Sequence, residues 1–269
     1  MSDTLHHVPQ NSPWPLSVAS GILMAGFGTL PLLYGLPVGW IMLIMGAFLF
    51  FLGLGGWMVS QAKEQIAQVA GTAHHEAPGA SKWFVAFLIV SEVFLFGALF
   101  AAYFFLHDRD VLKTQSFLHF FTHQGEILHV VGPVVYLNTI LLVSSSFTLH
   151  FAEHLLKHGK LLGFRILLGV TVVLGLLFMG GQVVEYINFI QEGITWDKGP
   201  YLTLFFTITA IHGLHVTAGA LILGSMFAGS FFGQFSPQHH SSLSVVSIYW
   251  HFVDVVWLFL LATLYFRLL

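Results

Sequence analysis

The chain has 269 residues, of which 56% are hydrophobic and 8% are charged, and its mean hydropathy is +0.82. Soluble domains carry about 25% charged residues, so this composition excludes a soluble enzyme and indicates an integral membrane protein. The net charge is −3 with only nine Lys and Arg residues, and cysteine is absent, which excludes a nucleic-acid-binding surface, disulfides, thiolate metal sites and iron–sulfur clusters.

Apolar stretches of about 20 residues, enough to cross the bilayer as a helix, recur along the chain. They predict seven transmembrane helices, at about 16–34, 38–60, 82–106, 130–156, 162–190, 200–228 and 241–268. The first dozen residues are polar and lack the pattern of a cleavable signal peptide, so the first helix is expected to be retained. The whole chain, 1–269, is expected to form a single integral membrane domain.

The loops divide these helices into two groups. The first two helices are joined by the short Gly/Pro turn "YGLPVG", whereas the next connection, "SQAKEQIAQVAGTAHHEAPGASK", is long and polar. A two-helix unit at about 16–60 therefore precedes a five-helix unit at about 82–268. The charged and aromatic segment "HDRDVLKTQSFLHFFTHQGEILH" is expected to lie along the membrane interface. The basic residues of the loops favour a cytoplasmic N-terminus.

Ionisable side chains inside the predicted helices need a partner or a function, because each costs at least about 2.5 kcal/mol at membrane depth. Glu92, in "FLIVSEVFLFG", lies ten residues into the third helix, near the membrane midplane, with no basic residue within one turn. Two interpretations of this carboxyl group stay open: a proton-linked or lipid-linked role, and a purely structural one.

Two further pairs have a spacing of three residues, which places each pair on one helix face. They are His212 with His215 in "TAIHGLHVTAG", and His251 with Asp254 in "YWHFVDVVWLF". Haem or copper ligation would need further ligands on facing helices, which the sequence does not identify, so hydrogen bonding between helices is favoured and no metal site is predicted. The predicted structural polar residues of the interior are His212, His251, Asp254, Asn138 and Glu185.

Five motifs carry a resemblance to a known family: "SPWPL", "SEVFLFG", "LNTILLVSS", "FFTITAIHGLHVTAGALIL" and "YWHFVDVVWLF". In this order and spacing, over essentially the whole chain, they resemble subunit III of the haem–copper cytochrome c oxidases. The resemblance implies an all-α fold of seven transmembrane helices, in which a V-shaped cleft holding phospholipid separates helices 1 and 2 from the five-helix bundle. It implies no catalytic residue, haem or copper in this chain.

The same resemblance implies an accessory subunit of a proton-pumping oxidase. Subunit I, with the haem and copper, is the expected main contact, together with subunit II and small subunits, and the chain is expected to support its stability and proton uptake. Glu92 matches a glutamate of the family that faces the lipid cleft near the proton pathway of subunit I. The residues matching lipid-binding positions are Trp57, Glu64, His75 and His215. The segment "GSMFAGSFFGQFSPQHH" lacks the basic residues that the family often has there.

Three alternatives stay open at this stage. A quinol oxidase subunit III would share the architecture, although such subunits often lack the first two helices. A free-standing proton-coupled transporter would use Glu92 and Asp254, but the internal repeats that are common in transporters are not visible. A haem enzyme in its own right would be coloured when isolated. The expected location is a respiratory membrane, the bacterial plasma membrane in particular.

Overall fold

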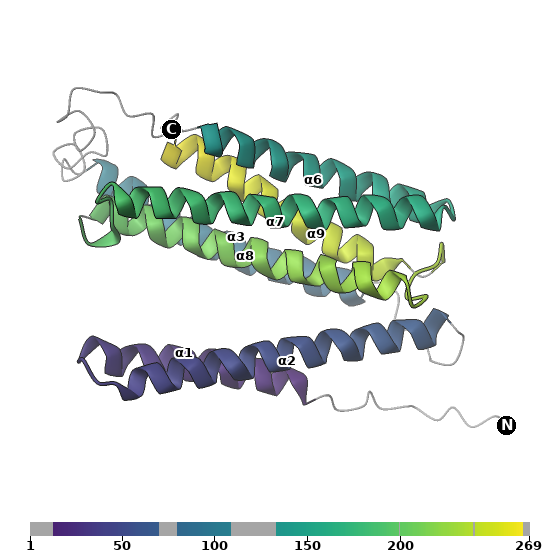
Figure 1. Cartoon of the computed structure of the whole chain (residues 1–269), viewed down its shortest axis with the longest axis horizontal. Coiled ribbons are helices and arrows are strands. Elements are labelled where there is room, and N and C mark those ends of the chain that lie inside the picture. Colours follow the sequence, from purple (N-terminus) through teal and green to yellow (C-terminus); the bar gives the residue numbers. More distant parts are fainter. Residues whose placement is uncertain (1–12, 70–79, 109–132, 199, 239, 266–269) are drawn as a thin grey trace. The chain divides into compact units, whose positions relative to one another are not determined.

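The computed structural model describes residues 13–69, 80–108, 133–198, 200–238 and 240–265, and within these ranges all regular structure is helical. Seven α-helices occur there: α1 (Trp14–Leu33), α2 (Val38–Val69), α3 (Ala80–Asp108), α6 (Pro133–Lys157), α7 (Leu161–Gln191), α8 (Pro200–Ser230) and α9 (Ser241–Leu260) (Figure 1). Six of them, α2 to α9, are long and apolar enough to cross a membrane. The prediction of an all-α membrane protein is thus confirmed.

Two helix ends differ from the prediction by more than three residues. Helix α2 continues past residue 60 to Val69, through "SQAKEQIAQV", because Gln, Ala, Lys and Glu are all good helix formers even where the sequence turns polar. Helix α9 does not reach residue 268 as a regular helix, since it passes after Leu260 into a π-helical turn, Leu261–Tyr265. The predicted interfacial segment at 109–132 lies outside the described residues.

The chain divides into two compact units, Met1–Ala73 and His74–Leu269. In the first unit α1 packs along α2, and the turn between them is closed by Gly35, whose φ of 70° is a left-handed conformation that glycine adopts without strain. The amide of Gly35 donates to the carbonyl of Leu32 over 2.9 Å. The expectation of one integral membrane domain over residues 1–269 stays a prediction.

Glycines bring the backbones of α1 and α2 into contact. A Cβ atom added to Gly46 would lie 2.5 Å from the backbone nitrogen of Ala25, and one added to Gly21 would lie 2.5 Å from that of Phe50. Small residues at such positions permit the close approach on which helix association in lipid depends.

Replacing Gly46 with Leu is therefore expected to destabilise the α1–α2 pair by about 1–3 kcal/mol, the usual cost of overpacking. The measurement is an SDS titration of the purified protein in mixed micelles, followed by far-UV circular dichroism. The matched control is Gly55→Leu on the same helix, where an added Cβ would meet no atom within 4 Å. Equal stability of the two variants would contradict the close packing of α1 and α2.

Helices α6, α7, α8 and α9 form most of the core of the second unit, to which Phe96, Phe100 and Tyr103 of α3 also belong. Helix α6 packs against α7 and α9, α7 also contacts α8, and α9 contacts both α3 and α8. The largest fully buried side chains include Trp250, Trp257, Phe164, Phe178 and Phe205. Edge-to-face contact between Phe178 and Trp257, with ring centroids 4.9 Å apart, ties α7 to α9. This packing fixes the faces on which the polar side chains of the bundle lie.

Candidate functional site

Glu92 on α3 pairs with His215 on α8. The Glu92 Oε2 and His215 Nε2 atoms are 2.8 Å apart, and the two side chains are 18% and 17% exposed. The other ring nitrogen, Nδ1, lies 2.8 Å from the carbonyl oxygen of Ile211 one turn earlier. A carbonyl can only accept, so Nδ1 carries a hydrogen, and the short contact to Glu92 holds one further proton shared between carboxyl group and ring. The pair is therefore a proton-holding contact between two helices.

Aromatic neighbours fix the orientation of this histidine. The ring of Phe96 on α3 lies 5.3 Å from the His215 ring, and the Tyr249 hydroxyl group donates to the His215 carbonyl oxygen over 3.2 Å. Three helices, α3, α8 and α9, thus meet at His215. The spacing within α3 could not reveal the partner of Glu92, because that partner comes from another helix. The lipid-headgroup role expected of His215 stays a prediction.

The interhelical hydrogen bonds expected of His251 and Asp254 are present, and Ser146 of α6 is the shared partner. The Ser146 hydroxyl group donates to Asp254 Oδ2, and His251 Nδ1 lies 3.0 Å from the same hydroxyl oxygen. Asp254 is buried, whereas His251 is only partly buried. One oxygen of a carboxyl group in the middle of a span thereby accepts a hydrogen bond from a hydroxyl group of the neighbouring helix.

His212 and Asn138 are buried as predicted, but neither side chain has a hydrogen-bond partner in the part of the chain that the structure describes. His212 instead stacks on Trp257, with ring centroids 5.5 Å apart. Asn138 lies against the backbone of Gly181, where an added Cβ would come 2.0 Å from Asn138 Oδ1. The hydrogen bonding expected of His212 is therefore replaced by aromatic stacking within the described residues.

Glu185 is buried on α7 and accepts a hydrogen bond from Gln182 Nε2 over 2.9 Å, one turn earlier on the same helix. The Tyr265 hydroxyl group is a further polar neighbour of this carboxyl group. Its contacts thus lie inside the bundle, and the structural role expected of it stays a prediction.

The residues expected to bind lipid are distributed over both units. Trp57, which is partly buried, and Glu64, which is exposed, lie on α2 in the first unit, and His215 lies in the second. His75 lies outside the described residues. Their lipid-binding role stays a prediction.

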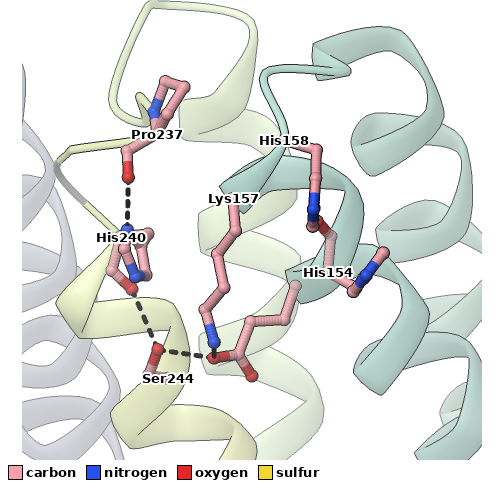
Figure 2. A network of polar contacts seen from close by, with 7 residues as sticks. His154, Lys157, His158, Pro237, His240 and Ser244 are labelled. Carbon is pink, nitrogen blue, oxygen red and sulfur yellow. Dashed lines mark hydrogen bonds and ion pairs between the residues drawn. The ribbon is translucent and has the colours of Figure 1, made fainter.

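A further group of polar side chains lies where α6 ends and α9 begins, and the sequence analysis missed it. Lys157 Nζ and Ser244 Oγ both contact Glu153 Oε1, at 2.7 and 2.6 Å. Figure 2 shows Ser244 of α9 beside Lys157 of α6, with His240 bonded through its Nδ1 atom to the carbonyl oxygen of Pro237 over 2.7 Å. The signal that could have identified this group is the repeat of polar residues every three or four positions on both helices.

Among the described residues, no three His, Asp or Glu side chains gather closely enough to hold a metal ion. The described part of the chain is that of a helical membrane protein with several spans, in which several ionisable side chains contact polar groups of neighbouring helices. Fold and site together define this class, and comparison with known sequences identifies the family.

The sequence matches the family described as cytochrome c oxidase subunit III over residues 4–268. Cytochrome c oxidase subunit 3 of Marchantia polymorpha is 30% identical over 263 residues, which cover 96% of this chain and 95% of that protein. The Thermostichus vulcanus subunit is 32% identical over 209 residues, 77% of this chain and 98% of that one, and the Polypterus ornatipinnis subunit is 31% identical over 268 residues. The chain belongs to the cytochrome c oxidase subunit III family, which confirms the resemblance carried by its motifs.

Proposed function

We propose that the chain is an accessory core subunit of a proton-pumping haem–copper terminal oxidase of an aerobic respiratory chain. Oxygen reduction is then an activity of the whole complex, whose haem and copper lie in partner subunits, while this chain itself is not catalytic. The observation that carries the proposal is the match to the family over residues 4–268. Subunit I is the proposed main contact, with subunit II and small subunits as further partners, in a bacterial plasma membrane with the N-terminus cytoplasmic.

Phospholipid is the proposed ligand of this subunit, held in a V-shaped cleft between helices 1 and 2 and the five remaining helices. The division of the chain into two compact units at Ala73 supports this arrangement. Trp57, Glu64, His75 and His215 are the proposed lipid-binding residues.

Purification in a gentle detergent tests the proposed function. The chain should bring haem-bearing partners with it, visible as cytochrome absorption bands and as further subunits in a mass-spectrometric subunit list. Isolation of a colourless chain without partners, from membranes in which it is intact, would instead favour the transporter alternative. Oxidation of ferrocytochrome c, compared with oxidation of a quinol by the same preparation, separates the cytochrome c oxidase from the quinol oxidase alternative.

Glu92 is proposed to influence proton uptake beside subunit I without carrying each pumped proton. Glu92→Gln keeps the shape of the side chain and can still hydrogen-bond His215, so oxidase turnover is expected to fall modestly at most, with faster inactivation over many cycles. The measurement is steady-state oxygen consumption together with proton release, at matched haem content. Complete loss of pumping in an intact complex would make Glu92 an obligatory proton carrier.

A further inference from the structure

Polar side chains form a stripe on α6 and another on α9, and the two helices contact each other. Within each stripe successive residues are three or four positions apart, which places them on one helix face. The stripe on α6 consists of Ser146, His150, Glu153 and Lys157, and the stripe on α9 consists of Ser244, Ser247, His251 and Asp254. The hydrogen bonds between these residues show that the two stripes face each other.

The outer end of this interface is built around Glu153, which is 13% exposed at its side chain. Its Oε1 atom accepts from Ser244 Oγ at 2.6 Å and contacts Lys157 Nζ at 2.7 Å. Ser247, one turn further along α9, is another polar neighbour of the same carboxylate. The carboxylate thus connects the solvent-exposed Lys157 (Figure 2) to hydroxyl groups inside the bundle.

The inner end continues from there through His251. The ionisable neighbours of this ring are His150 and Glu153, and its Nδ1 atom lies 3.0 Å from Ser146 Oγ. Ser146 in turn donates to Asp254 Oδ2. The second oxygen, Oδ1, is buried and has no hydrogen-bond partner among the described residues. Ser146 therefore supplies the hydrogen bond that the structure records for the Asp254 carboxyl group.

These contacts reach deep into the span. Ser244 and Asp254 are ten residues apart, or about 15 Å of helix rise, in a span that covers Ser241–Tyr265. No ionisable side chain on the described parts of the other helices that contact α9 is bonded to Asp254. On α3 and α8, Glu92 pairs with His215 and His212 stacks on Trp257. On α7, Glu185 accepts from Gln182. Asp254 is thus connected to one end of the bundle through the α6–α9 interface.

We propose that this interface conducts protons between the end of the bundle, where α6 ends and α9 begins, and Asp254, which binds one exchangeable proton. His251 gives its Nδ1 proton to Ser146 Oγ as Ser146 passes its hydroxyl proton to Asp254 Oδ2. The Glu153 carboxylate takes a proton from water and passes it to the other ring nitrogen of His251, whose ionisable neighbour it is. Glu153, His251 and Ser146 each receive one proton and give one, so the net result is one proton moved from water to Asp254. This inference does not depend on which oxidase the chain serves.

Infrared spectroscopy of the full-length chain in lipid nanodiscs, with the partners that purify with it, tests the proposal. The carbonyl band of protonated Asp254 is identified as the band that is absent from Asp254→Asn. After a change from H₂O to D₂O this band shifts, and the rate of the shift measures proton exchange at Asp254. Ser146→Ala is expected to slow this exchange about 100-fold, the scale on which one positioned proton-transfer group acts. Ser146→Thr, which keeps the hydroxyl group, should restore the rate.

The matched control is Ser225→Ala on α8, because that hydroxyl group donates only to the carbonyl of Ile222 on its own helix; its exchange should keep the parental rate. Glu153→Gln tests the outer end independently and should slow exchange as well, because an amide cannot pass on a proton. The proposal is overturned if Asp254→Asn removes no carboxyl band at any pH, or if exchange keeps the parental rate in Ser146→Ala or, where that variant does not fold, in Glu153→Gln.

Discussion

Replacing Trp250 with Ala is expected to lower the free energy of unfolding by about 3–5 kcal/mol, at the upper end of core truncations. Trp250 is fully buried, and Cβ atoms added to Gly175 and Gly219 would come within 3.0 and 2.8 Å of its ring. Because the two residues that flank the ring are glycines, neither has a side chain that could move into the space that the indole leaves. The measurement is an SDS titration in mixed micelles followed by far-UV circular dichroism.

Trp250→Phe is the control for this prediction. It keeps an aromatic ring in the space but removes the hydrogen bond from Trp250 Nε1 to Ser145 Oγ, which spans 2.9 Å. The Ser145 hydroxyl group still donates to the carbonyl oxygen of Leu142 over 2.6 Å. Losing the indole donor should therefore cost about 0.5–1.5 kcal/mol, the net contribution of one hydrogen bond, which is clearly smaller than the loss for Trp250→Ala. Equal losses in the two variants would show that the hydrogen bond, and not the filling of the space between the glycines, dominates at this position.

The second large effect is expected at the contact between α3 and α8. His215→Leu leaves the carboxyl group of Glu92 without its partner, and breaking such a pair by removing one member costs about 3 kcal/mol, at the lower end because both side chains are partly exposed. The same titration measures this loss.

A double-mutant cycle separates the pair from the packing around it. Glu92→Leu combined with His215→Leu removes both polar groups, so the double variant should be more stable than the sum of the single losses predicts, with a coupling energy of about 1–3 kcal/mol. Strict additivity would mean that the 2.8 Å contact contributes nothing to stability.

The helices could be predicted from the sequence because hydrocarbon thickness sets their length and apolar composition marks them. The predicted helix at 162–190 and α7, Leu161–Gln191, differ by one residue at each end. Hydropathy does not mark the end of α2, because good helix formers continue through "SQAKEQIAQV" after the apolar stretch has ended. The short turn before α2 was equally visible, because Gly35 and Pro37 mark it.

The candidate site could be predicted only in part. His212, Asp254 and Asn138 were identified as buried polar residues because each interrupts an apolar helix. The partner of Asp254 could not be identified, because the hydroxyl group of Ser146 lies on another helix, 108 residues earlier, and no spacing rule within a helix connects the two. His215 shows the same limit, because its contact with Glu92 depends on how α3 packs against α8.

The division of the chain at Ala73 has an evolutionary consequence. The buried core described for the second unit begins at Phe96 and takes no residue from α1 or α2. A lineage could therefore gain or lose the first seventy or so residues as one block without removing a residue of that core. Selection can thus act on the two blocks separately, so the first is free to diverge in sequence, or to disappear, at a pace that the second does not share.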